Sequence, residues 1–475
     1  MSKLVAIPFT AFLLSACAVG PHYVTPATAP ITLSNPHVAG FASPQPQPTP
    51  PQQWWSFFED QQLTQLIDSA LAHNHDIRQA WANVQASRAV FDQQRLEQYP
   101  TLTAQAGYQR SSRQQADSNG IVQRTLAESY RVGVDAQWEL DLFGRLQHLT
   151  ASAQARSQAA QAELAQMHLT IAAEVGRHYY ARTGIRQQLA LATAQVQSWR
   201  ATLQLTKARV ELGSGLPEDQ ENAHANLLRS EAALGPLQVR LQEEQYRLDV
   251  LTGNRPGQPA AMTAAEINPS PLARQLPLGD VDALIRQRPD VVRAERLLAA
   301  STEDIGAATA ELYPRLNLAG FIGFFALRGG ALGSASSQAF EIAPGASWPL
   351  LPMGSSRARV RVTEAQAEGA LARYQQALLV AQEEVENAVT RLVQQQERLR
   401  ALLQSAAHGA AALEIAGHRY RSGAGSYLAV LENQRALYEI RTELAAADTA
   451  SCVNVIALYQ ALGWGGAAAT AQATE

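Results

Sequence analysis

The sequence contains one internal duplication, and this duplication restricts the possible folds more than any other feature. Residues 138–144 (WELDLFG) and 348–354 (WPLLPMG) both begin with Trp and end with Gly, at an offset of 210 positions. The same offset joins Arg209 to Arg419, Gly213 to Gly423, Gly215 to Gly425, Leu227 to Leu437, Leu234 to Leu444, Leu248 to Leu458 and Gly253 to Gly463. Upstream, an offset of 214 joins Asp76 to Asp290 and 99–102 (YPTL) to 313–316 (YPRL). These pairs predict a tandem duplication, in which each half forms one copy of the same supersecondary unit.

Each half is predicted to contain two β-strands. Residues 130–141 alternate between apolar and mostly polar side chains, which is typical of a strand with one apolar face, and residues 102–109 alternate in the same way. The second pair, near 314–328 and 338–351, is less regular because Gly and Pro344 interrupt it. Strands of membrane barrels show this alternation, although a half-buried soluble sheet would show it too.

The remainder of each half is predicted to be helical. A first helix, over about 62–98 and again over 280–311, ends at Tyr-Pro because the residue before proline avoids the helical conformation. A proline-free stretch over 145–212 follows the strands; as one helix it would be about 100 Å long. A turn at 213–217 precedes a return helix to about 251, with a leucine every seven residues as in a supercoil: Leu227, Leu234, Leu241 and Leu248. The second half repeats this plan with a helix over 355–421, a turn at 423–425 and a return to 462.

The N-terminus predicts export from the cytoplasm. Lys3 precedes an apolar stretch over 4–14, which fits a secretory signal peptide and is too short for a transmembrane helix of about 20 residues. Residues 14–17 (LSAC) resemble the bacterial lipobox, which implies cleavage before Cys17 and a diacylglycerol on its sulfur. An ordinary signal peptide with a cysteine at this position by chance is the alternative. Ala18 differs from the Asp of inner-membrane retention signals, so the outer membrane is the expected destination.

Composition excludes several classes of protein. The net charge of −4 gives no basic footprint for nucleic acid. If Cys17 is acylated, Cys452 is the remaining cysteine of the two, no intrachain disulfide can form, and its apolar helical pattern favours a buried, inert thiol. After the N-terminus there is no apolar run of about 18 residues, which excludes a helical membrane protein. A bilayer-crossing part would then have to be a β-barrel.

Four strands cannot close a membrane barrel by themselves. Open edges in lipid leave backbone groups unpaired, at a cost of several kcal/mol each. Two chains would supply eight strands, whose interior fills with side chains, and three would supply twelve, so a conducting function favours the larger number. The sequence alone does not choose between three chains and four.

Several landmarks along nearly the whole chain resemble the TolC-like outer-membrane factors. They are the lipobox, Trp54-Trp55, 288–291 (RPDV), 313–316 (YPRL), 419–423 (RYRSG), Leu428 and Gln434-Arg435. The resemblance is closest to the acylated branch that serves resistance-nodulation-division efflux pumps. It implies a mixed fold of all-α coiled hairpins and transmembrane strands, in a homotrimer whose twelve-stranded β-barrel continues as a twelve-helix α-barrel across the periplasm. The implied partners are a periplasmic adaptor, an inner-membrane resistance-nodulation-division transporter and outer-membrane lipids, with no cofactor except the lipid on Cys17.

The resemblance also implies site residues at the two helical turns. Six of them match the tip motif that meets the adaptor in this family: Arg209, Gly213, Gly215, Arg419, Gly423 and Gly425. The glycines are also explained by the positive φ of a helix end, and both explanations can hold. Leu428 and Glu432 align with the channel constriction, where the family commonly has Asp in place of Glu432; a solvated glutamate on a helix face is the alternative. Glu218, Asp219 and Glu221 predict an acidic mouth in the first half, where Asn222 replaces Glu432.

No catalytic or metal site is predicted, so the chain is not expected to be an enzyme. His73 and His75 flank Asn74, and alternate residues of a helix do not share a face. Cys452 has no neighbouring set of zinc ligands, and no glycine-rich phosphate loop follows a strand.

The predicted organisation is a signal peptide, a tether, two repeats joined by a linker, and a tail. Their ranges are 1–16 for the signal peptide, 17–60 for the lipid anchor and extended proline-rich tether, 61–256 and 280–463 for the repeats, 257–279 for the linker and 464–475 for the tail. The predicted function is a passive, gated exit duct for small molecules across the periplasm and outer membrane. A duct for type I protein secretion and a non-conducting structural envelope protein are the alternatives. The exported substrate cannot be read from the sequence.

Overall fold

The computed structural model describes residues 18–34, 53–116, 120, 122–258, 280–351 and 353–465. The predicted signal peptide, the acylated Cys17, most of the linker and most of the C-terminal tail lie outside the described residues. The chain divides into two compact units. The first contains residues from 1–27, 83–160 and 293–375, and the second contains residues from 28–82, 161–292 and 376–475. Each unit therefore takes segments from both halves of the duplicated sequence.

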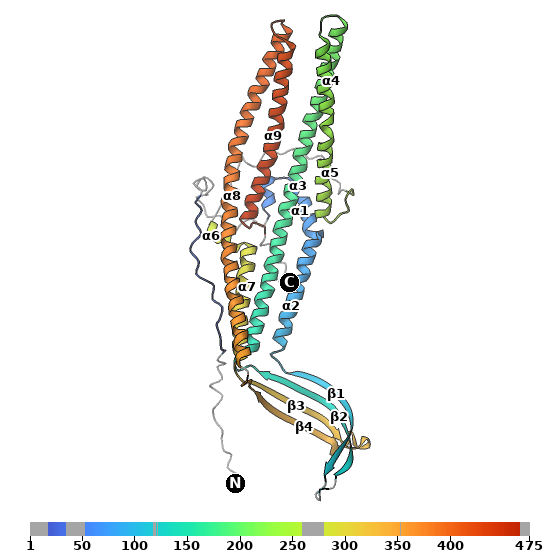
Figure 1. Ribbon diagram of the computed structural model, residues 1–475, viewed down its shortest axis with the longest axis vertical. Coiled ribbons are helices and arrows are strands. Elements are labelled where there is room, and N and C mark those ends of the chain that lie inside the picture. The colour runs from blue at the N-terminus through green and yellow to red at the C-terminus, as the bar shows by residue number, and fades with distance from the viewer. Residues whose placement is uncertain are drawn as a thin grey trace. The chain divides into compact units, whose positions relative to one another are not determined.

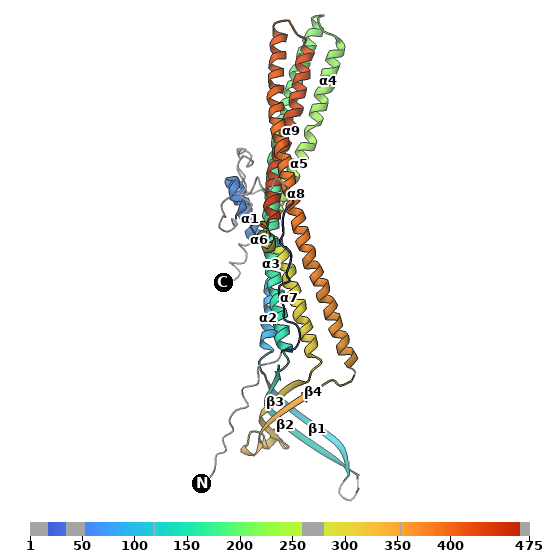
Figure 2. The same cartoon turned by 90° about the vertical axis from the view of Figure 1, so that its left-hand side faces the viewer.

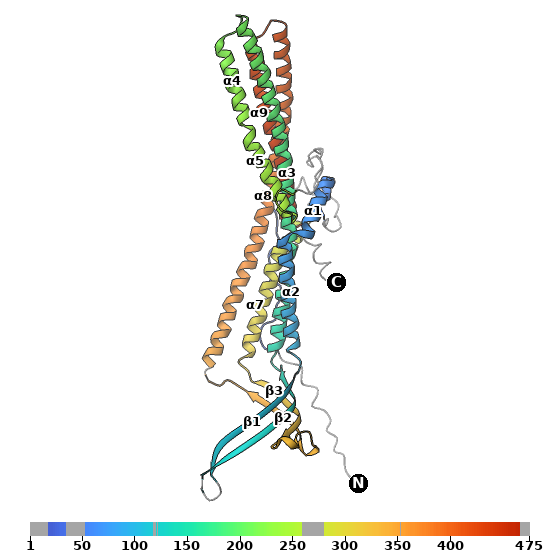
Figure 3. The same ribbon diagram turned by 90° about the vertical axis from the view of Figure 1, so that its right-hand side faces the viewer.

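The first unit contains one antiparallel sheet of four strands in the order β1-β2-β3-β4 (Figure 1). The strands are β1 (Thr101–Ala116), β2 (Val122–Leu140), β3 (Arg315–Ala326) and β4 (Gln338–Ser347), with two short 3-10 helices, η4 (Gly329–Ala331) and η5 (Ala335–Ser337), between the last two. The second strand pair, although less regular in sequence, thus joins the first in a single sheet. The strands β1, β2 and β3 lie side by side in Figure 3 as well.

The register of the sheet separates an apolar face from a polar face. Val134 of β2 pairs with Ala104 of β1 and with Ile322 of β3, which in turn pairs with Phe340 of β4. Paired residues share a face, and Ile322 and Phe340 are 69% and 80% exposed on it. On the other face, Nη2 of Arg131 lies 2.5 Å from Oδ1 of Asp135, and the Arg131 guanidinium lies over the Phe321 ring. The apolar face therefore continues across all four strands, whereas the opposite face of β3 carries Phe321 and Phe325, which pair with Asp135 and Arg131.

Long helices form the two hairpins of the duplicated plan. The first hairpin contains α3 (Arg145–Glu211), α4 (Pro217–Ala232) and α5 (Leu234–Leu251); the second contains α8 (Met353–Arg421) and α9 (Tyr427–Ala461). In the second unit α4 and α5 run beside α3, and α9 runs beside α8 (Figures 1 and 3). The prediction of a single return helix to 251 is wrong in one respect, because the structure has two helices there, divided at Ala233. Pro236 explains the division, since it has no N–H to donate and its ring would clash with the preceding helical turn.

The helix before each strand pair is also divided, which corrects two predicted helices. The predicted helix 62–98 is α1 (Gln61–His73) and α2 (His75–Leu96), and the predicted helix 280–311 is α6 (Val281–Gln287) and α7 (Pro289–Ala310). Asn74 makes the first break, because its Oδ1 accepts from the backbone N–H groups of Asp76 and Ile77 at 2.9 and 3.2 Å and so caps α2. Pro289 makes the second, as the first residue of a new helix.

Aromatic side chains fill the core of the second unit beside the short helix η2 (Trp54–Phe58). Trp54 is fully buried, and its ring stacks on Tyr459 with centroids 5.9 Å apart. Asp60 then begins α1 by accepting from the N–H groups of Gln62 and Leu63, and the hydroxyl of Tyr179 donates to the same carboxylate at 2.7 Å. The landmark Trp54-Trp55 is therefore a core element.

Residues 18–34, which we call the N-terminal strap, fall in the predicted extended tether but make specific contacts. In the first unit, the Val19 N–H donates to the Phe143 carbonyl at 3.1 Å, and the Tyr23 hydroxyl donates to Glu295 at 2.5 Å. In the second unit, the Ile31 N–H donates to Asp282 at 2.8 Å. Among the helices that the structure describes, none is both long enough and apolar enough to cross a membrane.

Candidate functional site

The turns of the two helical hairpins have the same backbone geometry. Both lie at the same end of the second unit (Figure 2). Gly213 and Gly423 follow the ends of α3 and α8 in the left-handed conformation, with φ of +70° and +74°. The N–H groups of Ser214 and Ala424 donate back to the carbonyls of Arg209 and Arg419 at 2.9 and 2.8 Å. This is a Schellman motif, which satisfies carbonyl groups that the helix end leaves unpaired.

The second glycine of each turn is favoured by close packing. A Cβ on Gly215 would lie 2.9 Å from the Cβ of Arg209, and one on Gly425 would lie 3.1 Å from the Cβ of Arg419. The two glycines of the spacing Arg-x-x-x-Gly-x-Gly are therefore explained by the turn itself, whereas the turn uses only the backbone and the Cβ of the arginine. Contact of these six residues with an adaptor remains a prediction.

A cleft of about 590 Å³ separates the ends of the two hairpins and brings together residues from both halves. Five of the predicted site residues line it: Arg209, Asp219, Gly425, Leu428 and Glu432. Aromatic side chains line it too, namely Trp199, Tyr420 and Tyr427, and the last two pack with ring centroids 5.1 Å apart. Polar contacts join the hairpins in this region: the hydroxyls of Thr202 and Tyr427 lie 3.3 Å apart, and Nε2 of Gln434 donates to Oγ of Ser198 at 2.5 Å. Gly213, Gly215, Glu218, Glu221, Arg419 and Gly423 are not among the lining residues.

Leu428 and Glu432 lie one helical turn apart near the start of α9. Ser426 caps this helix by accepting from the Ala429 N–H at 3.2 Å. In the single chain Leu428 is 63% exposed, and Glu432 is exposed as well. An exposed leucine beside an exposed carboxylate, at the mouth of a cleft, can form an apolar and an acidic ring if copies of the chain meet around an axis.

The turns carry opposite charges on their two sides. Glu218 and Asp219 lie in the first turn of α4, after Pro217, and Glu221 follows; all three are exposed. Basic side chains occupy the last turn of α8, including Arg419 and Arg421. Acidic groups at a helix start and basic groups at a helix end both interact favourably with the helix dipole. The surface at the turns is therefore strongly polar on both hairpins.

The Arg288-Pro289-Asp290 landmark has a structural explanation that sequence reasoning missed. The Arg288 side chain is 5% exposed; its Nη1 donates to the carbonyl of Ala461 at 2.6 Å, and its Nη2 lies 2.7 Å from Asp290 and 2.6 Å from Glu384. Arg288 therefore connects the break between α6 and α7 to the end of α9. No spacing in the sequence indicates a partner 173 residues away, so the contact could not be predicted.

The sheet, the duplicated hairpins and their glycine turns define the class of a TolC-like outer-membrane factor. Residues 66–254 and 281–464 match the family described as outer membrane efflux protein, and the chain belongs to that family. Outer membrane protein OprJ of Pseudomonas aeruginosa is 30% identical over 96% of this chain and 94% of its own length. Probable efflux pump outer membrane protein TtgC of Pseudomonas putida is 28% identical over 100% of this chain and 98% of its own length. A structure of the outer-membrane channel OprN has a TM-score of 0.87 and 34% identity, covering 95% of this chain and 100% of that chain.

These similarities establish the place and the role of the chain. It is an outer-membrane protein, and it is the channel component of an efflux system.

Proposed function

We propose that three copies of this chain form one gated, passive duct that carries small molecules through the periplasm and the outer membrane. The main support is the sheet, in which β1 pairs only with β2 and β4 only with β3 within the described strands. Unpaired strand edges in lipid cost several kcal/mol per backbone group, so each sheet must continue into the next copy. Three copies give twelve strands and room for an aqueous path, whereas two give eight strands and a filled interior.

The apolar face of the sheet is the side that we propose to face the lipid. Ile322, Phe340 and Ile342 are each more than two-thirds exposed on that face, which is unfavourable in water and favourable in hydrocarbon. The face with Arg131 and Asp135 then lines the lumen. The proposed duct acts passively and not as an enzyme, and the support for this is its membership of the outer membrane efflux protein family.

The hairpin turns are the proposed contact with a periplasmic adaptor, which in turn recruits an inner-membrane resistance-nodulation-division transporter. The support is the exposed, oppositely charged surface around Arg209, Arg419 and the acidic group Glu218, Asp219 and Glu221. Energy comes from the transporter, and the chain described here supplies the path.

Three measurements test this function. Native mass spectrometry of the purified protein should give a trimer. A different dominant oligomeric state would refute the proposed stoichiometry of three chains. In planar bilayers the trimer should conduct, and trimers without conductance would identify a structural bridging protein. Spin labels at Val134 should be accessible to lipid-soluble oxygen and labels at Gln137 to water; the reverse would exchange the two faces.

A further inference from the structure

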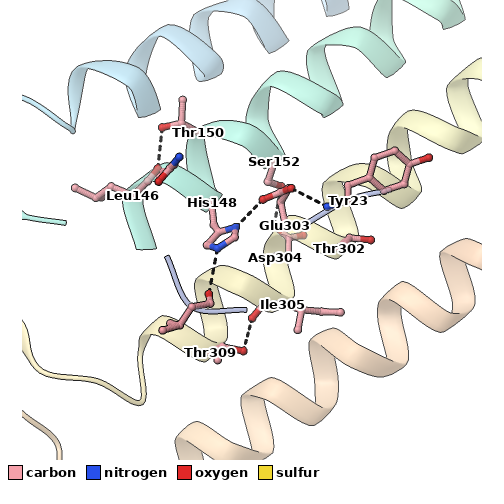
Figure 4. A network of polar contacts seen from close by, with 12 residues as sticks. Tyr23, Leu146, His148, Thr150, Ser152, Thr302, Glu303, Asp304, Ile305 and Thr309 are labelled. Atoms are coloured by element: carbon pink, nitrogen blue, oxygen red, sulfur yellow. Dashed lines mark hydrogen bonds and ion pairs between the residues drawn. The ribbon is translucent and has the colours of Figure 1, made fainter. Parts of the chain in front are cut away.

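His148 lies in the first turn of α3, and both of its ring nitrogens face oxygen atoms (Figure 4). Only 1% of its side chain is exposed. Nδ1 lies 2.6 Å from Oε2 of Glu303 on α7, and Nε2 lies 3.1 Å from the carbonyl oxygen of Val19 in the N-terminal strap. The imidazole therefore joins three segments of the first unit.

The protonation of this ring follows from its partners. The Val19 carbonyl and the Glu303 carboxylate both accept hydrogen bonds, so a neutral imidazole, which has one N–H, can satisfy only one of them. When Nε2 carries that hydrogen, Nδ1 presents its lone pair to a carboxylate oxygen 2.6 Å away. Two acceptors at this distance repel each other, so a cation has to lie between them. A proton satisfies this requirement, and a metal ion can replace the proton.

His22 supplies a third donor at the same place. Its ring stacks on that of His148 with centroids 5.5 Å apart, and the ligand atoms of His22, His148 and Glu303 all lie within 4.8 Å of one another. Because an imidazole nitrogen binds a metal in the plane of its ring, the exposed His22 ring has to turn out of the stacked arrangement to share an ion with His148. Two imidazoles and one carboxylate form a ligand set that proteins use for Zn²⁺, with water in the fourth position. Bonds of about 2.0–2.2 Å place tetrahedral ligands about 3.3 Å apart, so Glu303 would withdraw from His148 by less than about 1 Å.

The surroundings hold the ring in the orientation that a metal ligand needs. Gly306 lies against the imidazole, where a Cβ would come within 2.4 Å of Cε1 of His148. The hydrogen bond from Nε2 to a backbone carbonyl is the outer-shell contact that metal-bound histidines commonly make, and it leaves Nδ1 as the ligand atom.

The neighbouring carboxylates have other partners. Asp304 accepts from Ser152 and from Arg156 at 2.7 and 2.6 Å. Glu295 accepts from the Tyr23 hydroxyl at 2.5 Å and pairs with Arg296. Among the described residues, the ion-pair partner of Glu303 is His148, and its Oε1 also accepts from the Tyr23 N–H at 3.4 Å. The charge of Glu303 is therefore the one available to a bound cation.

We propose that His22, His148 and Glu303 bind one divalent transition-metal ion, with Zn²⁺ as the best match to the ligand set. The ion fastens the N-terminal strap to α3 and α7 and is separate from the conducting role of the duct.

The test is a metal titration of the full-length protein after removal of metals with a chelator. Isothermal titration with Zn²⁺ at pH 7.5 should give one ion per chain, and Co²⁺ should give the visible absorption of a tetrahedral site. His22→Gln changes an exposed side chain, so the fold should survive, and the affinity should fall about tenfold or more. Glu303→Gln should weaken binding similarly.

A matched control is available in the second unit. Nδ1 of His178 lies 2.6 Å from Oε2 of Glu244, the same pair at the same distance, but no third ligand joins it among the described residues. His178→Gln should leave the Zn²⁺ affinity unchanged. No binding at pH 7.5 would overturn the proposal and leave a proton alone between His148 and Glu303. Binding that survives in both His22→Gln and Glu303→Gln would overturn it as well, because the ion would then lie elsewhere.

Discussion

Asn74 and Arg288 occupy equivalent positions in the two halves, and each donates to the last carbonyl of its own return helix. Nδ2 of Asn74 lies 3.0 Å from the carbonyl oxygen of Leu251, and Nη1 of Arg288 lies 2.6 Å from that of Ala461. The carbonyls at a helix end lack intrahelical partners, so both contacts satisfy acceptors that would otherwise be unpaired. The duplication has kept a contact while the residue that makes it has changed.

Two tryptophans show the same relationship at the other end of the repeat. The indole Nε1 of Trp138 donates to the carbonyl of Gln98, and that of Trp348 donates to the carbonyl of Leu312, both at 3.0 Å. Each contact ties the end of the second strand of a pair to the end of the helix before Tyr-Pro. The Trp landmark at the offset of 210 is therefore explained by one hydrogen bond made twice.

Arg288→Ala should destabilise the second unit, because it leaves the Ala461 carbonyl unpaired and removes a cation from Asp290 and Glu384. Both carboxylates are partly exposed and can turn toward water, so we expect a loss of about 2 kcal/mol, below the cost of breaking a fully buried ion pair. Thermal unfolding in detergent measures this. Arg398→Ala, an exposed arginine on α8, is the control, and an equal effect of the two variants would contradict the assigned role.

Gly423→Ala should destabilise the second turn by about 1 kcal/mol, because alanine is strained at a φ of +74°. Gly417→Ala is the matched control: it lies inside α8, where a Cβ would meet only Nη1 of Arg421 at 4.0 Å, and it should stabilise by about 0.5–1 kcal/mol. Gly423→Asn, which tolerates positive φ, separates structure from recognition. If Gly423→Asn folds normally but loses adaptor binding in surface plasmon resonance, the glycine itself contacts the adaptor. Normal adaptor binding would limit its role to the turn.

Cys452 should be unreactive toward thiol reagents in the folded protein. Two effects raise the pKa of this thiol to about 12: burial, which is the larger, and the charge of nearby Asp448. Almost no thiolate therefore forms at pH 8. Since the folded pKa lies above the ordinary value of 9.0, the thiol's contribution to stability is complete below about pH 9 and is lost as the pH rises toward 12. Titration with a colorimetric disulfide reagent should show the thiol only after denaturation; a fast reaction at pH 8 in the native protein would contradict this.

Cys17 should be the acylated first residue of the mature chain. The prediction comes from residues 14–17 (LSAC), which lie outside the part of the chain that the structure describes. Mass spectrometry of the purified protein should detect a lipid-modified peptide that begins at Cys17. An unmodified N-terminal peptide with a different start would show that these residues are an ordinary signal-peptide cleavage region.

Periodicity and repetition predicted the elements of the fold well, because long regular segments are dominated by local preferences. The prediction failed where one side chain overrides its segment: Asn74 caps a new helix inside a helical pattern, and Pro236 divides the return helix. Both effects were visible in the sequence but were outweighed by the surrounding pattern. The sites differ in this respect. The glycine turns have a local signature, whereas His22, His148 and Glu303 are brought together by packing across the chain and have no spacing that could reveal them.

Leu428 should hold the resting duct closed, with Glu432 setting its ionic preference. Leu428 is 63% exposed in one chain, so its burial has to come from the other copies around the axis. Three Glu432 carboxylates brought together repel each other, and apolar contact between the leucines has to compensate. Leu428→Ser removes that contact. The closed state then loses at most about 2–5 kcal/mol per chain, the value for a well-buried leucine, and less at a partly hydrated turn. This loss is enough to shift the population toward the open state.

Single-channel conductance without an adaptor measures this shift: it should be low for the parent protein and higher for Leu428→Ser. Leu403→Ser, at a half-exposed leucine of α8 away from the turn, is the matched control and should leave conductance unchanged. Glu432→Gln should reduce cation preference more than it changes conductance, and this effect should fade at high salt because the ions screen the carboxylates. If Leu428→Ser conducts like the parent while deletion of the 422–426 turn opens the channel, the constriction lies at other residues of the turn.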